Sequence, residues 1–80
     1  MNRKNEIQKV KELIKKYYRY SKYGIYNTRN IVNDPMETIY HGSYFMLDIC
    51  YSYGYFEVFG TTNEEFEELE EYYASLRNGE

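Results

Sequence analysis

The chain has 80 residues and a net charge of −3, with 42% hydrophobic and 29% charged residues. This length suits one small domain spanning residues 1–80, and the composition is that of a globular chain. Collagen-like, low-complexity and disordered chains are therefore excluded. A segment that crosses a bilayer needs about 20 apolar residues in succession. No stretch approaches that length, so we expect no membrane contact.

Reactive side chains are scarce. The chain has one cysteine, Cys50, and one histidine, His41. A single thiol cannot close an internal disulfide, and no group of residues has the spacing of metal ligands, so we expect neither a metal nor a cofactor. The cysteine usage favours a reducing, cytoplasmic setting. The N-terminal stretch alternates charged and apolar residues and so lacks the unbroken apolar region of a secretory signal.

Charge is divided along the chain. Residues 1–24 hold eight Lys and Arg against two Glu, a net charge of +6. Residues 25–80 hold two Arg against eleven acids, a net charge of −9. Such opposite charges can attract each other within the fold, pair subunits head to tail, or meet different partners.

The first predicted element is an amphipathic helix from about Asn5 to Tyr20, ending near Gly24. Helical spacing places Ile7, Val10, Ile14, Tyr17 and Tyr18 on one side. The opposite side carries Lys9, Glu12, Lys15, Lys16 and Arg19. Turn-forming residues follow as far as Pro35, within which Arg29–Val32 suits a short edge strand.

Between Met36 and Phe59 the pattern changes to the period of two that is typical of strands. We predict strands at Glu37–Tyr40, Tyr44–Tyr51 and Tyr55–Phe59, and consider the register that follows if the first turn holds three residues and Tyr53-Gly54 is a two-residue turn. This register pairs Ile39 with Phe45, Tyr51 with Phe56, and Ile49 with Val58. The predicted core face is Ile39, Phe45, Leu47, Ile49, Tyr51, Phe56 and Val58. The opposite face carries Tyr40, Tyr44, Met46, Asp48, Cys50, Tyr55, Glu57 and Phe59.

A second helix follows Gly60. Thr62 is the expected N-cap, and Glu65 three residues later completes a capping box. Asn78 and Gly79 end the helix. Its inward stripe is Phe66, Leu69, Tyr73 and Leu76. The outward residues are Glu64, Glu67, Glu68 and Glu71, flanked by Glu65 and Glu70.

Catalysis has one candidate group, formed by His41, Cys50 and Asp48. The predicted turns place His41 near Ser43 or Tyr44, several residues along the strand from Cys50. At a rise of about 3.3 Å per residue, that separation is too great for proton transfer. We therefore expect no enzymatic activity.

The sequence resembles the small proteins encoded by phages and mobile elements of Firmicutes, some of which are anti-CRISPR inhibitors. The runs that carry the resemblance are NTRNIVNDPMETIY (Asn27–Tyr40) and YFEVFGTTNEEFEELEEYY (Tyr55–Tyr73), within a span from Asn27 to Leu76, about two-thirds of the chain. No motif of known function matches residue by residue, so no functional position is carried over. The resemblance implies a binder in the host bacterial cytoplasm that acts by stoichiometric blockade.

The sequence therefore predicts an α+β fold in the order α-β-β-β-α, a three-stranded antiparallel sheet flanked by a basic and an acidic helix. If both helices cover one face, we expect the tyrosines of the other face to be exposed for a partner or a second copy.

The leading function is a DNA-mimicking inhibitor of a host nuclease or CRISPR effector protein, because spaced carboxylates can occupy a cationic channel. Its predicted partner-binding residues are Glu64, Glu67, Glu68, Glu71, Tyr40, Tyr44, Tyr55 and Phe59. One competitor is a nucleic-acid-binding regulator, which would use Lys9, Lys15, Lys16 and Arg19. The other is a self-associating protein, for example a homodimer.

Overall fold

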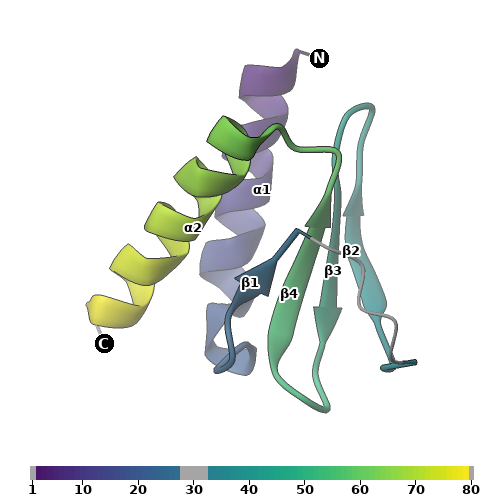
Figure 1. Cartoon of the computed structure of the whole chain (residues 1–80), viewed down its shortest axis with the longest axis vertical. Coiled ribbons are helices and arrows are strands. Elements are labelled where there is room, and N and C mark those ends of the chain that lie inside the picture. The colour runs from purple at the N-terminus through teal and green to yellow at the C-terminus, as the bar shows by residue number, and fades with distance from the viewer. Residues whose placement is uncertain (1, 28–32, 80) are drawn as a thin grey trace.

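A computed structural model describes residues 2–27 and 33–79, and it contains two α-helices and one four-stranded mixed sheet. Both helices lie on the same side of the sheet (Figure 1). The strand order is β1-β4-β3-β2, with β1 parallel to β4 and the other pairs antiparallel. The elements in chain order are α1 (Arg3–Tyr17), the 3-10 helix η1 (Tyr18–Tyr20), β1 (Ile25–Tyr26), β2 (Glu37–His41), β3 (Met46–Cys50), β4 (Tyr55–Phe59) and α2 (Asn63–Asn78).

The α+β class is confirmed, but the predicted three-stranded antiparallel sheet is wrong. Strand β1 adds a fourth, parallel strand beside β4, where Ile25 pairs with Phe56. It is only two residues long and pairs with a strand about thirty residues away, so no local alternation marks it. The edge strand predicted at Arg29–Val32 lies outside the described residues.

Helix α1 follows its prediction closely. The Asn2 side chain caps it by accepting a hydrogen bond from the Asn5 backbone N–H at 2.8 Å. The helix ends at Tyr17 rather than near Gly24. Gly24 instead precedes β1, and its carbonyl accepts a hydrogen bond from the Phe56 N–H at 2.9 Å. The stripe that α1 buries against the sheet is Ile7, Val10 and Ile14.

Helix α2 begins with the capping box predicted from the sequence. The Thr62 hydroxyl accepts from the Glu65 N–H at 3.2 Å, and the Glu65 carboxylate accepts from the Thr62 N–H at 2.8 Å. Leu69 and Tyr73 are buried, and Phe66 and Leu76 pack against the same core, so the inward stripe is confirmed.

The hairpin register differs from the prediction, although the core face is largely correct. Ile49 pairs with Phe56 rather than Val58, because four residues, 51–54, connect β3 to β4 instead of two. A shift of two positions keeps each side chain on its face. Tyr51 consequently leaves the sheet and is 43% exposed. The strand residues buried beneath the helices are Leu47, Ile49, Phe56 and Val58, with Phe45 beside them.

The first hairpin is also shifted. Tyr40 pairs with Leu47, and the register slips between Thr38 and Tyr40, so Ile39 does not face Phe45. Pairing with Leu47 places Tyr40 on the face beneath the helices, which corrects its predicted place on the opposite face. The irregularity inserts one extra residue into this edge strand. The side chains after it therefore lie on the opposite faces from those that regular alternation would give them.

The opposite charges of the two helices attract each other within the fold. The helices start at the same end of the molecule and run side by side (Figure 1). Arg3 Nη2 lies 2.5 Å from Glu65 Oε1, and Lys11 Nζ lies 2.6 Å from Glu68 Oε2. This is one of the three outcomes that the divided charge allows.

A buried carboxylate joins α1 to the turn between β2 and β3. Glu6 is fully buried and accepts hydrogen bonds from the backbone N–H groups of Ser43, Tyr44 and Phe45 at 3.1–3.4 Å. Burial alone raises the pKa of the Glu6 carboxyl, but the hydrogen bonds that it accepts, including one from Tyr40, outweigh this effect and hold the pKa below its usual value. Glu6 therefore holds the first hairpin against α1.

Candidate functional site

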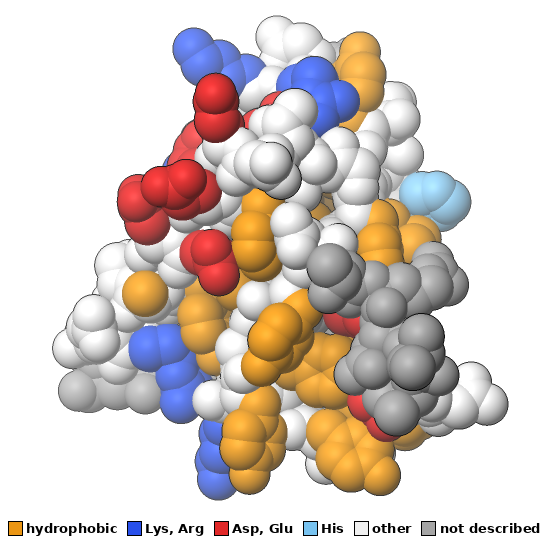
Figure 2. Space-filling model, in the orientation of Figure 1, with side chains coloured by type: hydrophobic (Ala, Val, Ile, Leu, Met, Phe, Trp, Pro, Cys, Tyr) orange, Lys and Arg blue, Asp and Glu red, His pale blue; other side chains and the backbone are white. Residues whose placement is uncertain are grey.

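Helix α2 presents four glutamates to solvent, which we call the acidic face: Glu64, Glu67, Glu68 and Glu71. All four are exposed, as predicted, and together they line a shallow hollow of about 260 Å³. Their spacing of three and four residues places them on one side of the helix, opposite the buried Leu69 and Tyr73. Figure 2 shows acidic side chains gathered over the first half of α2.

Most carboxylates of the acidic face have no ion-pair partner within the described part of the chain. Among residues 2–27 and 33–79, Glu68 alone of the four forms an ion pair, with Lys11. Four carboxylates on a rigid helix create a concentrated negative field. The arrangement can bind a cationic surface.

The aromatic residues predicted to accompany these glutamates do not form one exposed patch. Tyr55 is 7% exposed, and its hydroxyl donates to Asp34 Oδ2 at 2.5 Å. Burial of the Tyr55 hydroxyl raises its pKa, and the hydrogen bond to Asp34 raises it further. Phe59 is half-buried, and Tyr40 is half-buried beneath the helices. Only Tyr44 of the four is exposed, at 44%.

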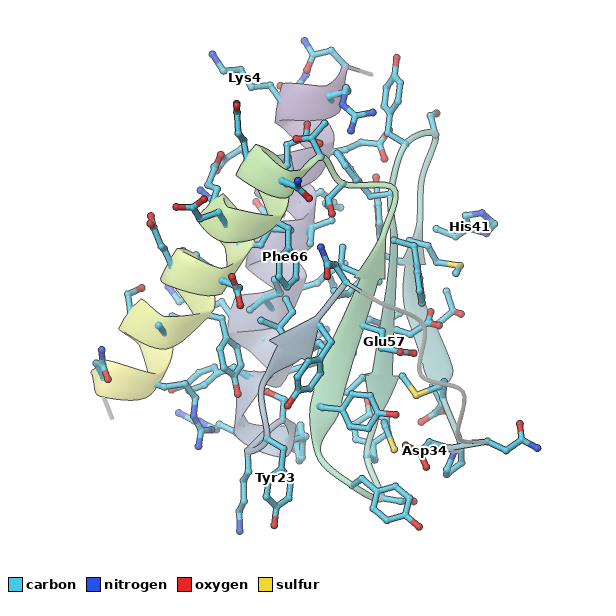
Figure 3. All side chains as sticks on the ribbon, viewed as in Figure 1. Lys4, Tyr23, Asp34, His41, Glu57 and Phe66 are labelled. Carbon is cyan, nitrogen blue, oxygen red and sulfur yellow. The ribbon has the colours of Figure 1, made fainter. Side chains whose placement is uncertain are left out.

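The second face of the sheet is therefore more enclosed than predicted. Both helices share the other face, yet Asp48 and Cys50 are buried here as well as Tyr55. The connection from β1 to β2 joins opposite edges of the sheet, and its residue Asp34 lies against Tyr55. Thr38 Oγ1 also donates to Asp48 Oδ1 at 2.8 Å. Figure 3 shows Glu57 and Asp34 on this face.

Tyr44 lies close to the start of α2. The Arg3 guanidinium carbon is 5.1 Å from the centroid of the Tyr44 ring, within the range of a cation–π contact, and the same guanidinium binds Glu65. Tyr44 is thus the one predicted aromatic anchor that is both exposed and next to the acidic helix.

The four cations predicted to bind nucleic acid are exposed: Lys9, Lys15 and Lys16 on α1, and Arg19 on η1. Lys16 Nζ lies 5.4 Å from the centroid of the Tyr17 ring. Glu12 is exposed among these cations and weakens their field.

An aromatic hollow that the sequence reasoning missed lies at the end of the molecule where both helices finish. It has a volume of about 320 Å³ and is lined by Arg19, Tyr20, Lys22, Tyr23, Tyr51, Ser52, Tyr53 and Gly54, which we call the tyrosine hollow. The signal is visible afterwards as two tyrosine-rich turns, YRYSKYG and YSYG. Nothing in either run alone shows that the two turns meet.

The catalytic candidates do not come together. His41 is exposed and pairs with Met46, whereas Cys50 is buried four positions further along β3. Four strand positions correspond to about 13 Å, which confirms the predicted separation. His41 points away from the sheet in Figure 3. Within the described residues, no group of His, Cys, Asp and Glu is arranged to hold a metal ion.

Comparisons of the chain with protein-family models, curated proteins and solved structures find no match. Neither helix of the described chain has both the length and the apolar character needed to cross a membrane.

Proposed function

We propose that this protein is a non-enzymatic inhibitor that binds a nucleic-acid-handling host protein, most specifically a CRISPR effector nuclease, through the acidic face. The observation that supports the proposal is the exposed hollow lined only by Glu64, Glu67, Glu68 and Glu71. In this role the carboxylates occupy the cationic side chains that otherwise hold a phosphate backbone.

The spacing of the carboxylates suits this role. From Glu64 to Glu71 the helix rises by about 10.5 Å, so the four charges have a mean separation of about 3.5 Å along its axis, in steps of about 4.5, 1.5 and 4.5 Å. Successive phosphates of one DNA strand are separated by about 3.4 Å along the duplex axis. Averaged over its four carboxylates, the acidic face has a linear charge density close to that of one DNA strand, and Lys11 neutralises part of this charge at Glu68.

The rigidity of α2 favours binding. The capping box fixes its first turn, Leu69 and Tyr73 are buried, and Arg3 binds Glu65 beside the acidic face. A preorganised array loses less conformational entropy on association than a flexible acidic tail does. Tyr44, next to the start of α2, supplies an exposed aromatic ring at the edge of this surface.

The test is a cleavage assay with purified CRISPR effector nucleases loaded with guide RNA. The diagnostic variant is E64Q/E67Q/E71Q, which leaves the Lys11–Glu68 ion pair in place. We expect the wild-type protein to inhibit at a ratio near one to one, and the triple variant to inhibit at least 10-fold less.

The matched control is E12Q/E37Q/E70Q, which removes the same charge from exposed positions outside the acidic face. It should inhibit like the wild type. An equal loss of inhibition in the two triple variants would show that net charge, rather than the acidic face, carries the effect.

The second candidate is a nucleic-acid-binding regulator, favoured by the exposure of Lys9, Lys15 and Lys16 on α1 and of Arg19 on η1. In this case K15Q/K16Q weakens DNA or RNA binding, and affinity falls steeply as salt is added. Sedimentation at low and high salt distinguishes self-association through the two charged helices from both the inhibitor and the nucleic-acid-binding regulator.

A further inference from the structure

The exposed tyrosines are concentrated at one end of the molecule. Of the six large hydrophobic side chains exposed in the described residues, four line the tyrosine hollow: Tyr20, Tyr23, Tyr51 and Tyr53. Their exposed fractions range from 43% to 72%. Figure 2 shows apolar and basic side chains meeting at this end, and Figure 3 shows Tyr23 projecting from it.

The two turns that carry these rings are fixed to each other. The Tyr23 backbone N–H donates to the Gly54 carbonyl at 2.8 Å, and the Gly54 N–H donates to the Cys50 carbonyl at 2.8 Å. The Tyr20 and Tyr51 rings meet edge to face, with centroids 5.6 Å apart. These contacts hold the two turns, and the Tyr20 and Tyr51 rings, in place before any ligand arrives.

The first of these turns is also fixed to α2. Ser21 is buried, its hydroxyl donates to the Tyr18 carbonyl at 2.6 Å, and its own carbonyl accepts a hydrogen bond from the Tyr73 hydroxyl. The hollow therefore lies on backbone that is anchored from both helices.

The charge at the hollow is positive. Arg19 and Lys22 are the charged residues of its lining, and no carboxylate is among the residues that line it. Lys15 and Lys16 are exposed in the last turn of α1, a few residues before Arg19, so exposed cations continue from α1 to the hollow. An anionic chain can follow this path.

We propose that the tyrosine hollow binds single-stranded nucleic acid, with bases stacked on the tyrosine rings and phosphates on Arg19 and Lys22. Proteins that bind single strands combine a positive groove with aromatic rings, because every base offers a flat face. The lining carries two cations and no carboxylate, so its charge favours an anionic occupant. Duplex bases are already stacked and are not available to the rings.

The experiment measures fluorescence anisotropy of labelled eight-nucleotide oligo(dT) and oligo(U), with an eight-base-pair duplex for comparison. We expect the single strands to bind more tightly than the duplex. The variant Y23S/Y53S should weaken binding by about 5- to 150-fold for each base that loses its ring. Thermal unfolding confirms that the variants are folded.

The salt dependence tests the cations. The variant R19Q/K22Q should reduce the slope of log affinity against log salt by about 1.4, since each phosphate contact to a single strand contributes about 0.7. The controls are Y44S, an exposed tyrosine outside the hollow, and K4Q, an exposed lysine near the start of α1. Neither control should change the affinity by more than about twofold.

Several results would overturn the inference. These are failure of both oligonucleotides to bind at low salt, equal losses in Y44S and Y23S/Y53S, or tighter binding of the duplex. Sedimentation that shows self-association abolished by Y23S/Y53S would place a second copy in the hollow instead. The assay uses no nuclease, so its outcome is independent of the inhibition proposed for the acidic face.

Discussion

At the end of the molecule where both helices begin, charged side chains bind other parts of the chain. Glu6 accepts hydrogen bonds from three backbone N–H groups, and Arg3 binds Glu65. At the end where the helices finish, four tyrosines, Arg19 and Lys22 line an open hollow. The first set of contacts connects segments distant in sequence, so it stabilises the fold. The tyrosine hollow leaves its rings and cations accessible, so they are available for a ligand. Substitutions at the two ends should therefore separate stability from binding.

The largest loss of stability is expected from Glu6→Ala. It removes the acceptor for three backbone N–H groups at a position that water does not reach, and unsatisfied buried donors are costly. We expect the melting temperature to fall by about 10 °C or more in a scan followed by circular dichroism. Glu12→Ala, at an exposed position of the same helix, should have little effect. Equal melting temperatures for the two variants would refute the anchoring role.

A smaller contrast is expected between two glycines with positive φ. Gly60 (φ +93°) and Gly54 (φ +80°) both adopt a backbone that costs other residues about 1–3 kcal/mol. In Gly60→Ala the new methyl group would also overlap the Tyr44 carbonyl oxygen, whereas in Gly54→Ala the nearest backbone atoms are 3.4 Å away. Chemical denaturation should therefore show the greater loss for Gly60→Ala. The reverse order would contradict the close approach of Gly60 to Tyr44.

The Arg3–Glu65 pair should make stability depend on acid pH. Its hydrogen bond, together with those between Glu65 and Thr62, lowers the pKa of Glu65 from 4.5 to about 2. A lowered carboxyl pKa stabilises the fold above the unfolded-state value, and this contribution is lost as the pH falls from about 4.5 to 2. Arg3→Gln should therefore flatten the decline in stability over that window, measured by urea unfolding. Identical pH profiles for the variant and the wild type would exclude the contribution.

The smallest effect on stability is expected at the tyrosine hollow. Tyr23 is 72% exposed, and it forms its hydrogen bonds to Gly54 and Tyr26 through its own backbone N–H and carbonyl, which a serine retains. Tyr23→Ser should change the free energy of unfolding by less than about 0.5 kcal/mol in urea titrations. A loss of several kcal/mol would show that the ring supports the fold, and the contrast between the two ends would fail.

The sequence predicts the features that depend on nearby residues. Helix α2 could be predicted with its cap because Thr62 and Glu65 are three residues apart and the apolar stripe repeats within the same helix. The acidic face follows from the same periodicity. The core face of β3 and β4 could be predicted despite the wrong turn length, because a register error of two positions leaves the alternation intact.

Features that depend on distant pairing could not be predicted. Strand β1 exists because Ile25 pairs with Phe56. Glu6 is buried where it accepts hydrogen bonds from residues 37 to 39 positions further along the chain. The hollow joins Tyr23 to Tyr53 by the same kind of distant contact. The slip near Tyr40 depends on the geometry of one edge strand, which the alternation of residue types does not encode.

The most direct test of the account applies both sets of variants to both probes. The acidic-face variant E64Q/E67Q/E71Q and the hollow variant Y23S/Y53S are compared for inhibition of a guide-loaded CRISPR effector nuclease and for binding of oligo(dT). The account predicts that the first variant loses inhibition and keeps oligonucleotide binding, and that the second loses oligonucleotide binding and keeps inhibition. Loss of both activities in both variants, or of neither in either, would contradict the assignment of separate partners to the two surfaces.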